Sequence, residues 1–301
     1  MLVCVLNADS PLGAELCRRL GDDALPVLRG EVDLLEGEQV FRLLLRLQPT
    51  AVINTAAYSD VEHAEIARDH CFAINAIAVK WMAKACALLH CPLVQISTDH
   101  VFAANCGQRR PYRETDPTCP RSVFAHSMRA GEVYAAECPR HFIVRTSALF
   151  GHLGPQPDDS NFVETMLRLS HTPAAHTPAA LPVSNDQYFS PSYVPHVAEA
   201  ILHLLKYSEA YGIYHIANFN FTTWFEFAKE IFRQNQIDAR LEPVSRSQGG
   251  GSDLWPSFSV LDTGKYHRTG GPTMPAWQTA LAEYLAVREQ LVGAASALDM
   301  Y

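Results

Sequence analysis

Residues 1–20, MLVCVLNADSPLGAELCRRL, decide the fold. The apolar run at 2–6 predicts a short buried strand, a polar turn follows it, and 12–20 has the apolar spacing of an amphipathic helix. A strand, a tight turn and a helix make the first unit of a parallel α/β sheet. The N-terminus therefore predicts an α/β protein.

The same alternation continues to residue 151. Further strands are predicted at 25–28, 51–54, 93–97 and 142–146, and helices at 36–47, 64–89 and 121–138. Strands separated by helices require right-handed crossovers, and such connections build a doubly wound parallel sheet.

The regular alternation of strands and helices ends after Gly151. Helices are predicted at 161–169, at 197–205, at 222–232 with Thr222 at the start, and from Ala276, and strands at 212–217 and near Val260. The duplicated HTPAA at 171–180 and the glycines at 249–251 predict loops. We infer a smaller C-terminal region against the carboxyl edge of the sheet, where doubly wound folds bind ligands.

Composition narrows the class of protein. The 301 residues include 24 Lys and Arg against 32 Asp and Glu, a net charge of −8, which disfavours binding to nucleic acid or anionic membranes. No apolar run approaches the ~20 residues of a membrane span, and the first is too short for a signal peptide. The eight cysteines contain no CxxC pair and the histidines no HExxH motif. We expect a cytoplasmic globular protein with no metal site, its cysteines mostly small buried residues in a reducing compartment.

Eight segments, taken in order, resemble one protein family. They are INTAAYSDVEHAE (53–65), ISTDHVF (96–102), IVRTSALFG (143–151), NFVETMLRL (161–169), VSNDQYFSPSY (183–193), GIYHIA (212–217), TTWFEFAKEIF (222–232) and SVLDT (259–263). The chain resembles the dTDP-4-dehydrorhamnose reductases, extended short-chain dehydrogenases, from about residue 2 to 285. The resemblance implies a Rossmann-like domain that binds NAD(P)H, a small domain that binds a nucleotide-linked sugar, and reduction of a 4-keto sugar. We expect the first domain at 1–151 with a returning segment near 183–205, the substrate region mostly at 152–301, and 183–193 crossing between them.

The first turn departs from the family pattern, GxxGxxG, at two of three glycines. The corresponding residues are Asn7, Ser10 and Gly13, with Leu12 beside the last. Asn tolerates positive φ, so position 7 retains its geometry, but the Ser10 side chain would point where bare backbone approaches the pyrophosphate. Pro11 also removes an N–H. We expect weakened cofactor binding, or a turn that is only structural.

Other positions match the family's cofactor contacts. Arg29 follows the second predicted strand, where no acidic residue stands to bind a ribose hydroxyl, and it suits a 2′-phosphate. NADP(H) is therefore favoured over NAD(H) if a dinucleotide binds, the alternative being a solvated surface charge. Asp33 and Leu34 match a motif that contacts adenine. Ala56, Ala57 and Tyr58 match the segment beside which the cofactor passes.

The largest departure concerns catalysis. The resemblance implies a Tyr-x-x-x-Lys pair, in which the phenol gives a proton to the carbonyl oxygen while the ammonium lowers the phenol's pKa. Alignment through the shared Gly131-Glu132 places Phe124 and Met128 at these two positions. Thr98 and Asp99 match the strand side of the site. Apolar side chains thus stand where the resemblance implies the phenol and the ammonium.

Two histidines near the pair are candidates for a substitute acid. His126 lies two positions from Phe124 and faces away on a helix, whereas His100 lies near Thr98 and titrates near neutrality. The alternative is that His100 only packs or hydrogen-bonds.

On the substrate side, Asn185, Asp186, Gln187 and Ser190 match the family's linker motif. Trp255 stands before Pro256, where the family often has an Arg suited to a diphosphate. A tryptophan stacks on a base or sugar but forms no bidentate phosphate pair.

Three functions remain open on the sequence. The first is a reductase-like protein with weak or lost catalysis and a binding or regulatory role, toward a partner enzyme of a sugar-nucleotide pathway. The second is an active NADPH-dependent reductase with a relocated acid, and the third a scaffold that binds neither ligand. The sequence leaves the sugar, the partner and the oligomeric state open.

Overall fold

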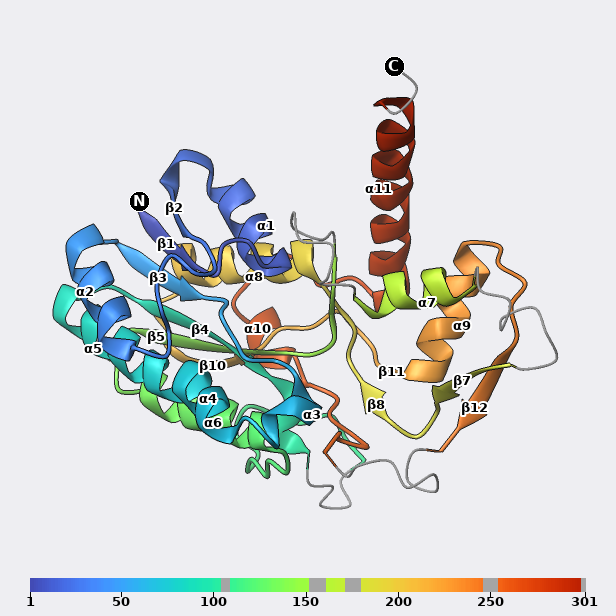
Figure 1. Cartoon of the computed structure of the whole chain (residues 1–301), viewed down its shortest axis with the longest axis horizontal. Coiled ribbons are helices and arrows are strands. Elements are labelled where there is room, and N and C mark those ends of the chain that lie inside the picture. Colours follow the sequence, from blue (N-terminus) through green and yellow to red (C-terminus); the bar gives the residue numbers. More distant parts are fainter. Residues whose placement is uncertain (104–108, 152–160, 171–179, 246–253, 299–301) are drawn as a thin grey trace.

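The structure is a computed structural model that describes residues 1–103, 109–151, 161–170, 180–245 and 254–298, with side chains described to residue 291 in the last helix. Figure 1 shows a large part, a sheet between helices, beside a smaller part that contains β7, β12, α7 and α9. The predicted loops at 171–179 and 249–251 lie outside the described residues.

The large part is built on a six-stranded sheet in the order β10-β5-β4-β3-β1-β2, with every pair parallel. Its strands are β1 (Val3–Leu6), β2 (Ala24–Val27), β3 (Ala51–Asn54), β4 (Leu93–Thr98), β5 (His141–Thr146) and β10 (Gly212–His215). The prediction that the first, third and fourth strands are parallel neighbours is confirmed. The sequence predicted β10 as a strand but did not place it in this sheet, where it pairs with β5.

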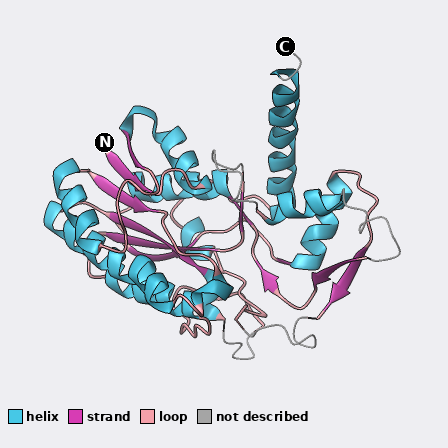
Figure 2. Cartoon of the chain, viewed as in Figure 1, coloured by secondary structure: helices cyan, strands magenta, loops and turns pink. Residues whose placement is uncertain are grey.

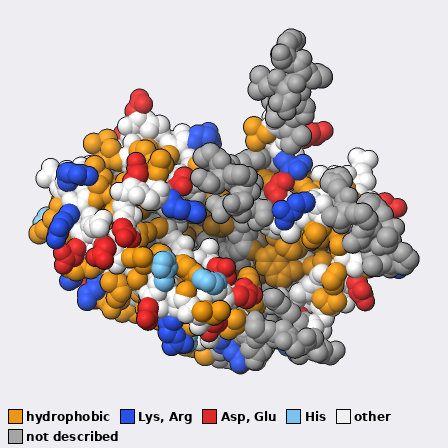
Figure 3. Space-filling view, viewed as in Figure 1, with side chains coloured by type: hydrophobic (Ala, Val, Ile, Leu, Met, Phe, Trp, Pro, Cys, Tyr) orange, Lys and Arg blue, Asp and Glu red, His pale blue; other side chains and the backbone are white. Residues whose placement is uncertain are grey.

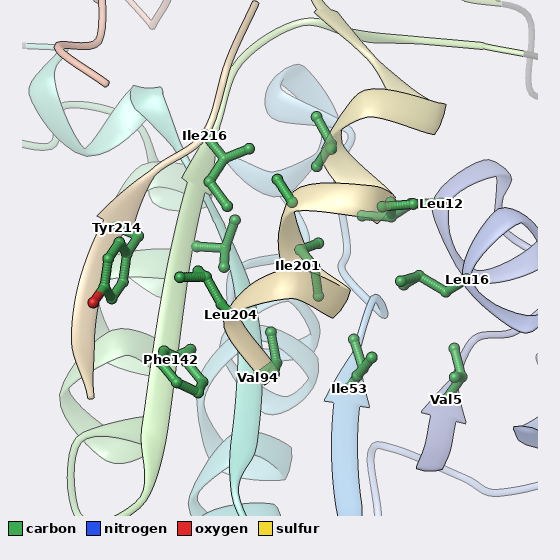
Figure 4. Close-up of a cluster of buried hydrophobic side chains, with 14 of the residues drawn as sticks. Val5, Leu12, Leu16, Ile53, Val94, Phe142, Ile201, Leu204, Tyr214 and Ile216 are labelled. Atoms are coloured by element: carbon green, nitrogen blue, oxygen red, sulfur yellow. The ribbon is translucent and has the colours of Figure 1, made fainter. Parts of the chain in front are cut away.

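Helices cover both faces of the sheet, as the doubly wound prediction requires. On one face, α1 (Pro11–Leu20) and α8 (Val194–Tyr207) pack on the strands through residues that include Leu12, Leu16 and Ile201. Figure 4 shows this cluster. On the other face lie α2 (Gly37–Leu47), α5 (Ala78–Leu89) and α6 (Val123–Ala135). Each layer buries one apolar face of the sheet, which is the main favourable contribution to folding.

The long helix predicted at 64–89 is divided. It comprises α3 (Val61–Ala64), α4 (Arg68–Phe72), a π-helical turn at Ala73–Ile77, and α5. The 22 residues Arg68–Leu89 are long and apolar enough to cross a membrane by length and composition alone. They pack between α2 and α6, and α5 buries Ala78, Val79 and Met82. This segment is thus the core helix of a globular fold.

Among the described residues, the smaller part contains three two-stranded sheets and a cluster of aromatic side chains. Figure 2 shows its strands and helices beside the larger sheet. Its strands are β6 (Leu149–Phe150) with β9 (Ser192–Tyr193), β7 (Leu181–Ser184) with β12 (Leu241–Val244), and β8 (Tyr188–Phe189) with β11 (Thr222–Thr223). Its helices are α7 (Phe162–Ser170), α9 (Trp224–Gln234) and α11 (Trp277–Leu298), and α10 (Gly264–His267) lies against β10. The end of α11 projects from the body of the molecule (Figure 1).

Two local predictions were wrong. The helix expected from Thr222 begins at Trp224, because the Thr223 hydroxyl accepts the Glu226 N–H at 3.2 Å as its cap, while Thr222 pairs with Phe189. The strand expected near Val260 is instead two isolated bridges, Tyr112 to Leu261 and Tyr188 to Phe258. The chain here contacts two different partners in turn, so no continuous ladder forms.

Candidate functional site

The first turn has a helix-capping role. Asn7 has φ 59°, which confirms the expected left-handed geometry. The Ser10 hydroxyl accepts the Gly13 N–H at 3.0 Å and lies 3.0 Å from the Thr55 hydroxyl. Pro11 has no N–H, so the turn offers an anion the N–H of Leu12 but not that of Gly13.

Gly13 is required by packing. A Cβ at this position would lie 2.4 Å from the Asn7 carbonyl oxygen and 2.9 Å from Ser10 Oγ. The third residue of the family pattern therefore keeps the role of a glycine where helix and strand end approach closely. It is the third residue of α1, which begins at Pro11 behind the Ser10 cap, one residue before the predicted start at 12.

A cavity of about 470 Å³ lies beside this turn, at the carboxyl ends of β1 and β2. Four of the residues predicted to contact a cofactor line it together: Asn7, Arg29, Asp33 and Leu34. The Arg29 backbone N–H donates to Asp9 at 2.8 Å, and its Nε donates to Asn7 Oδ1 at 3.4 Å. The guanidinium is exposed at the rim of this cavity and also lines the next one.

A second cavity of about 480 Å³ continues from Asn7 and Arg29 toward α6. Predicted residues that line it are Asn7, Ser10, Leu12, Arg29, Ala57, Thr98, Asp99, His100, Phe124, Met128 and Trp255. Ala56 is buried and Tyr58 is not among the lining residues; the Tyr58 hydroxyl contacts the His63 ring. One cleft thus joins the first turn to Phe124 and Met128.

Helix α6 is held close to the π-helical turn. A Cβ at Gly131 would lie 2.1 Å from the Asn75 carbonyl oxygen, so glycine alone permits this approach. The Asn75 side chain accepts the Tyr58 N–H at 2.7 Å and donates to Ser127 Oγ at 2.9 Å. Asn75 thereby fixes the segment after β3 against α6. π-Helical turns are frequent at functional sites, and this one sets the cleft wall.

Phe124 and Met128 lie on the cleft side of α6, as the i, i+4 spacing predicts. Only 7% of Phe124 and 5% of Met128 is exposed, and both pack in an apolar cluster with Val61, Leu254 and Trp255. His126 is exposed, which agrees with its expected direction away from the pair.

Thr98 ends β4 and Asp99 follows it, at the carboxyl edge of the sheet. Thr98 Oγ1 accepts the His100 N–H at 3.1 Å. The buried Asp99 carboxylate accepts the hydroxyls of Ser147 at 2.7 Å and Ser259 at 2.5 Å. Asp99 therefore joins the large sheet to the segment from the C-terminal region, and its charge is compensated by two donors.

His100 lies between the two aromatic rings of the cleft wall. Its ring meets Phe124 edge-on at 5.4 Å and Trp255 at 5.1 Å between centroids. Its Nδ1 is buried without a hydrogen-bond partner. Burial lowers the pKa of His100 against the opposing effect of Asp99 and Glu62, so the imidazole is neutral at pH 7.

The residues predicted for the substrate side lie in different places. A third cavity of about 220 Å³ adjoins the second through Asp99, His100 and Trp255, and Gln187 lines it. Asn185 does not line these cavities; its Oδ1 accepts the Thr223 hydroxyl at 2.9 Å. Asn185 is thus engaged within the smaller part.

Sequence reasoning missed Thr146, Ser259 and Glu62. Thr146 ends β5 opposite Thr98 and lines the second cavity, and the strand-end rule could have indicated it. Ser259 binds Asp99, and Glu62 binds Trp255 from 193 positions away, contacts that no local pattern encodes.

Within the described residues, no group of three His, Cys, Asp or Glu side chains is placed to hold a metal ion. Seven cysteines are described and free, and five of them are buried: Cys4, Cys71, Cys86, Cys91 and Cys138. The eighth, Cys106, lies outside the described residues.

A doubly wound sheet with this cleft across its carboxyl edge is the architecture of the Rossmann class, in which ligands bind at that edge. The family model for the RmlD substrate binding domain matches residues 1–289. The chain belongs to this family, that of the dTDP-4-dehydrorhamnose reductases.

Individual relatives cover nearly the whole chain. The chain is 34% identical to the spore coat polysaccharide biosynthesis protein SpsK of Bacillus subtilis (strain 168), over 95% of this chain and 97% of that protein. It is 34% identical to a dTDP-4-dehydrorhamnose reductase of Streptomyces griseus, over 93% and 91%. The structure of the Bacillus anthracis str. Ames reductase in complex with NADP superimposes with a TM-score of 0.85 at 32% identity, over 95% and 99% of the two chains.

Proposed function

We propose that the protein binds a nicotinamide dinucleotide and a nucleotide-linked sugar in the family cleft but reduces 4-keto sugars weakly or not at all, and serves as a binding or regulatory subunit. The observation that carries this proposal is the pair Phe124 and Met128, which line the cleft where the family's proton donor and its ammonium are expected. The proposed setting is the cytoplasm, with an enzyme of sugar-nucleotide metabolism as partner.

The shape of the cleft suits a dinucleotide. Two cavities meet at Asn7 and Arg29, so an adenosine and a nicotinamide would lie on either side of the first turn. Arg29 would pair with a 2′-phosphate, which favours NADP(H). The pyrophosphate would be bound weakly, because the Gly13 N–H already donates to the Ser10 hydroxyl and Pro11 has no N–H to donate. When bound, the reduced cofactor would supply a hydride.

The chain's own residues do little for proton transfer at this position. Phe124 has no dissociable proton, and Met128 neither lowers a phenol's pKa nor binds ribose hydroxyls. Thr98 is held by the His100 N–H and retains a role in orienting a carbonyl. Loss of a positioned acid costs at least about 100-fold in rate.

His100 is the alternative acid, because it lines the same cavity. Burial lowers the pKa of His100, so the protonated form is scarce at pH 7. A relocated-acid reductase predicts normal turnover that His100→Ala abolishes. A scaffold without ligands predicts that neither NADPH nor a dTDP-sugar binds.

The test combines binding and turnover on the full chain. NADPH is titrated by nicotinamide fluorescence, and reduction of a dTDP-4-keto sugar is followed in the wild type and in Phe124→Tyr/Met128→Lys. We expect weak NADPH binding, turnover at least about 100-fold below an intact relative, and a gain in the double variant. Phe124→Leu/Met128→Leu is the matched control, since it changes both side chains without restoring either group. Normal turnover by the wild type would refute the proposal.

A further inference from the structure

Two phenylalanines outside the cleft are exposed to solvent. The exposed fraction is 56% for Phe219 and 47% for Phe221. Both line a cavity of about 330 Å³, which shares no lining residue with the three cavities described above. Scattered exposed apolar residues are ordinary, but two that line one cavity indicate a binding surface. This cavity is therefore a second candidate site.

The fold holds the two phenyl rings in place before any ligand binds. The Phe219 N–H donates to the Pro275 carbonyl at 2.9 Å, and the Phe219 carbonyl accepts the Trp277 N–H at 3.1 Å. The Phe221 ring packs against Phe258, with 6.3 Å between the ring centroids. Ligand sites are usually formed in advance in this way, because less conformational freedom is then lost on binding.

The lining of this cavity is apolar in one part and polar in another. Besides the two phenyl rings, its apolar lining residues are Pro111, Val260 and Leu261. Its polar lining residues are Asn218, Asn220, Asp262, Thr263 and His267. Aromatic side chains pack against other rings in offset or edge-to-face arrangements. A planar ring therefore suits the apolar part, and a polar substituent suits the rest.

The segments that complete the cavity are basic, although the chain as a whole is acidic. Residues 109–116 and 260–268 together carry five Lys and Arg against three Asp and Glu, whereas the whole chain carries 24 against 32. Both segments contribute lining residues, so the local charge differs in sign from that of the chain. Such a local excess favours a ligand with negative charge.

Asp262 is the one carboxylate among the described lining residues, and its charge is compensated. Its Oδ1 accepts the Gly264 N–H at 2.8 Å, and its Oδ2 lies 3.5 Å from Arg113 Nε. Arg268 stands at the same rim, since a Cβ at Gly264 would lie 3.3 Å from Arg268 Nη1. One carboxylate thus faces two guanidinium groups, and a positive charge is left over.

The donors at this rim select the anion. His267 is exposed and lines the cavity beside Arg268. Guanidinium and imidazole N–H groups donate to phosphate oxygens, and hydrogen bonds of this kind between charged groups are the stronger ones. About 330 Å³ is the size of a site for a small ligand. A small phosphate that also carries a ring would use both parts of the lining.

We propose that this cavity binds a small phosphate that carries a planar ring, with the ring against Phe219 and Phe221 and the phosphate at His267 and Arg268. The inference goes beyond the proposed function, because this site is separate from the cleft. The same chemistry is present in aryl phosphates and in nucleoside monophosphates, and the experiment distinguishes the two sources.

Amide NMR shifts of the isotope-labelled full chain report both binding and its place. The probes are phenyl phosphate and dTMP, with inorganic phosphate as the anion alone and phenol as the ring alone. We expect at least one ring-bearing phosphate to shift the amides of 218–221 and 260–268. It should bind at least about threefold more tightly than either inorganic phosphate or phenol.

Variants separate the contributions of the ring and of the charge. Phe219→Ala should weaken the ring-bearing phosphate by about twofold to tenfold and leave inorganic phosphate unchanged, whereas Phe219→Tyr should bind like the wild type. Arg268→Gln should weaken both phosphates by about threefold or more. Leu88→Ala and Arg46→Gln are the controls, because both change exposed side chains of other helices and should change no affinity.

Every outcome decides for or against the site. Tighter binding of dTMP supports a nucleoside source, tighter binding of phenyl phosphate an aryl source, and equal binding the shared class. Equal affinities for phenyl phosphate and inorganic phosphate, unchanged by Phe219→Ala, would mean an adventitious ion only and overturn the inference. So would binding of phenol alone, shifts confined to the cleft, or no shifts at all. None of these results alters the proposed function, which NADPH binding and turnover of a 4-keto sugar decide.

Discussion

The indole Nε1–H of Trp255 donates to the Glu62 carboxylate at 2.7 Å and joins the C-terminal region to α3 across the cleft. Trp255 also packs on His100, and Leu254 beside it belongs to the apolar cluster of Phe124 and Met128. The segment that carries Trp255 is therefore attached to the wall formed by Phe124 and Met128.

This contact predicts an energetic coupling between Glu62 and Trp255. In a double-mutant cycle of Glu62→Ala and Trp255→Phe, measured by urea unfolding, the coupling should be about 0.5–1.5 kcal/mol, the usual net worth of one hydrogen bond. A cycle of Glu38→Ala with Trp255→Phe is the control, because Glu38 pairs with Arg42 on α2. Additive effects in the first cycle would show that the contact does not stabilise the fold.

Replacing Ser10 should raise the affinity for the cofactor and lower the stability of α1. Ser10→Gly frees the Gly13 N–H for an anion, so NADPH should bind more tightly, and tighter still with Asn7→Gly. The helix loses its cap, yet glycine is itself a fair cap, so the free energy of unfolding should fall by only a few tenths of a kcal/mol. Ser10→Ala should cost about 1 kcal/mol. Unchanged NADPH affinity in Ser10→Gly would remove the capped N–H as the cause of weak binding.

Restoring an ammonium at position 128 should lower the stability of the fold. Met128 is 5% exposed among apolar side chains, so Met128→Lys places an amine in a dry site. Without ligand the free energy of unfolding should fall by about 2 kcal/mol or more, as for a polar group buried without a partner. Met128→Leu conserves volume and should cost under about 1.5 kcal/mol. Equal stabilities would mean that the cluster opens to water.

The sequence predicted the sheet and most of its helices because the periodicity of apolar residues encodes burial on each element. Strand–helix alternation and strand-end residues such as Thr98 follow from such local patterns. The Ser10 cap could also be predicted, since a serine before Pro11 suits a helix start. The break at Glu65–Ala67 separates α3 from α4, and both of these short helices pack against α6, a tertiary contact that local periodicity does not encode.

The missed contacts at the site have another cause. Ser259 reaches Asp99, and Glu62 reaches Trp255, between segments 160 and 193 residues apart. Neither pair leaves a repeating signal in the chain, because each depends on how the smaller part lies against the sheet. On the face in Figure 3, acidic and basic side chains of the described residues are interspersed.

His215 should make stability depend on pH. Burial, and next the Arg145 guanidinium, lower the pKa of His215 to about 3, whereas an unfolded histidine titrates near 6.5. Because the unfolded state binds the proton first, this contribution is fully present above about pH 6.5 and is lost as pH falls toward 3, by up to about 1.4 kcal/mol per pH unit.

His215→Asn keeps a donor for the Tyr112 carbonyl, which His215 Nδ1 contacts at 3.0 Å, but cannot titrate. Urea unfolding at pH 7.5, 6.0 and 5.0 should show the wild type losing more stability than His215→Asn, while the exposed control His126→Asn follows the wild type. Parallel curves for wild type and His215→Asn would mean that folding does not lower the pKa of His215.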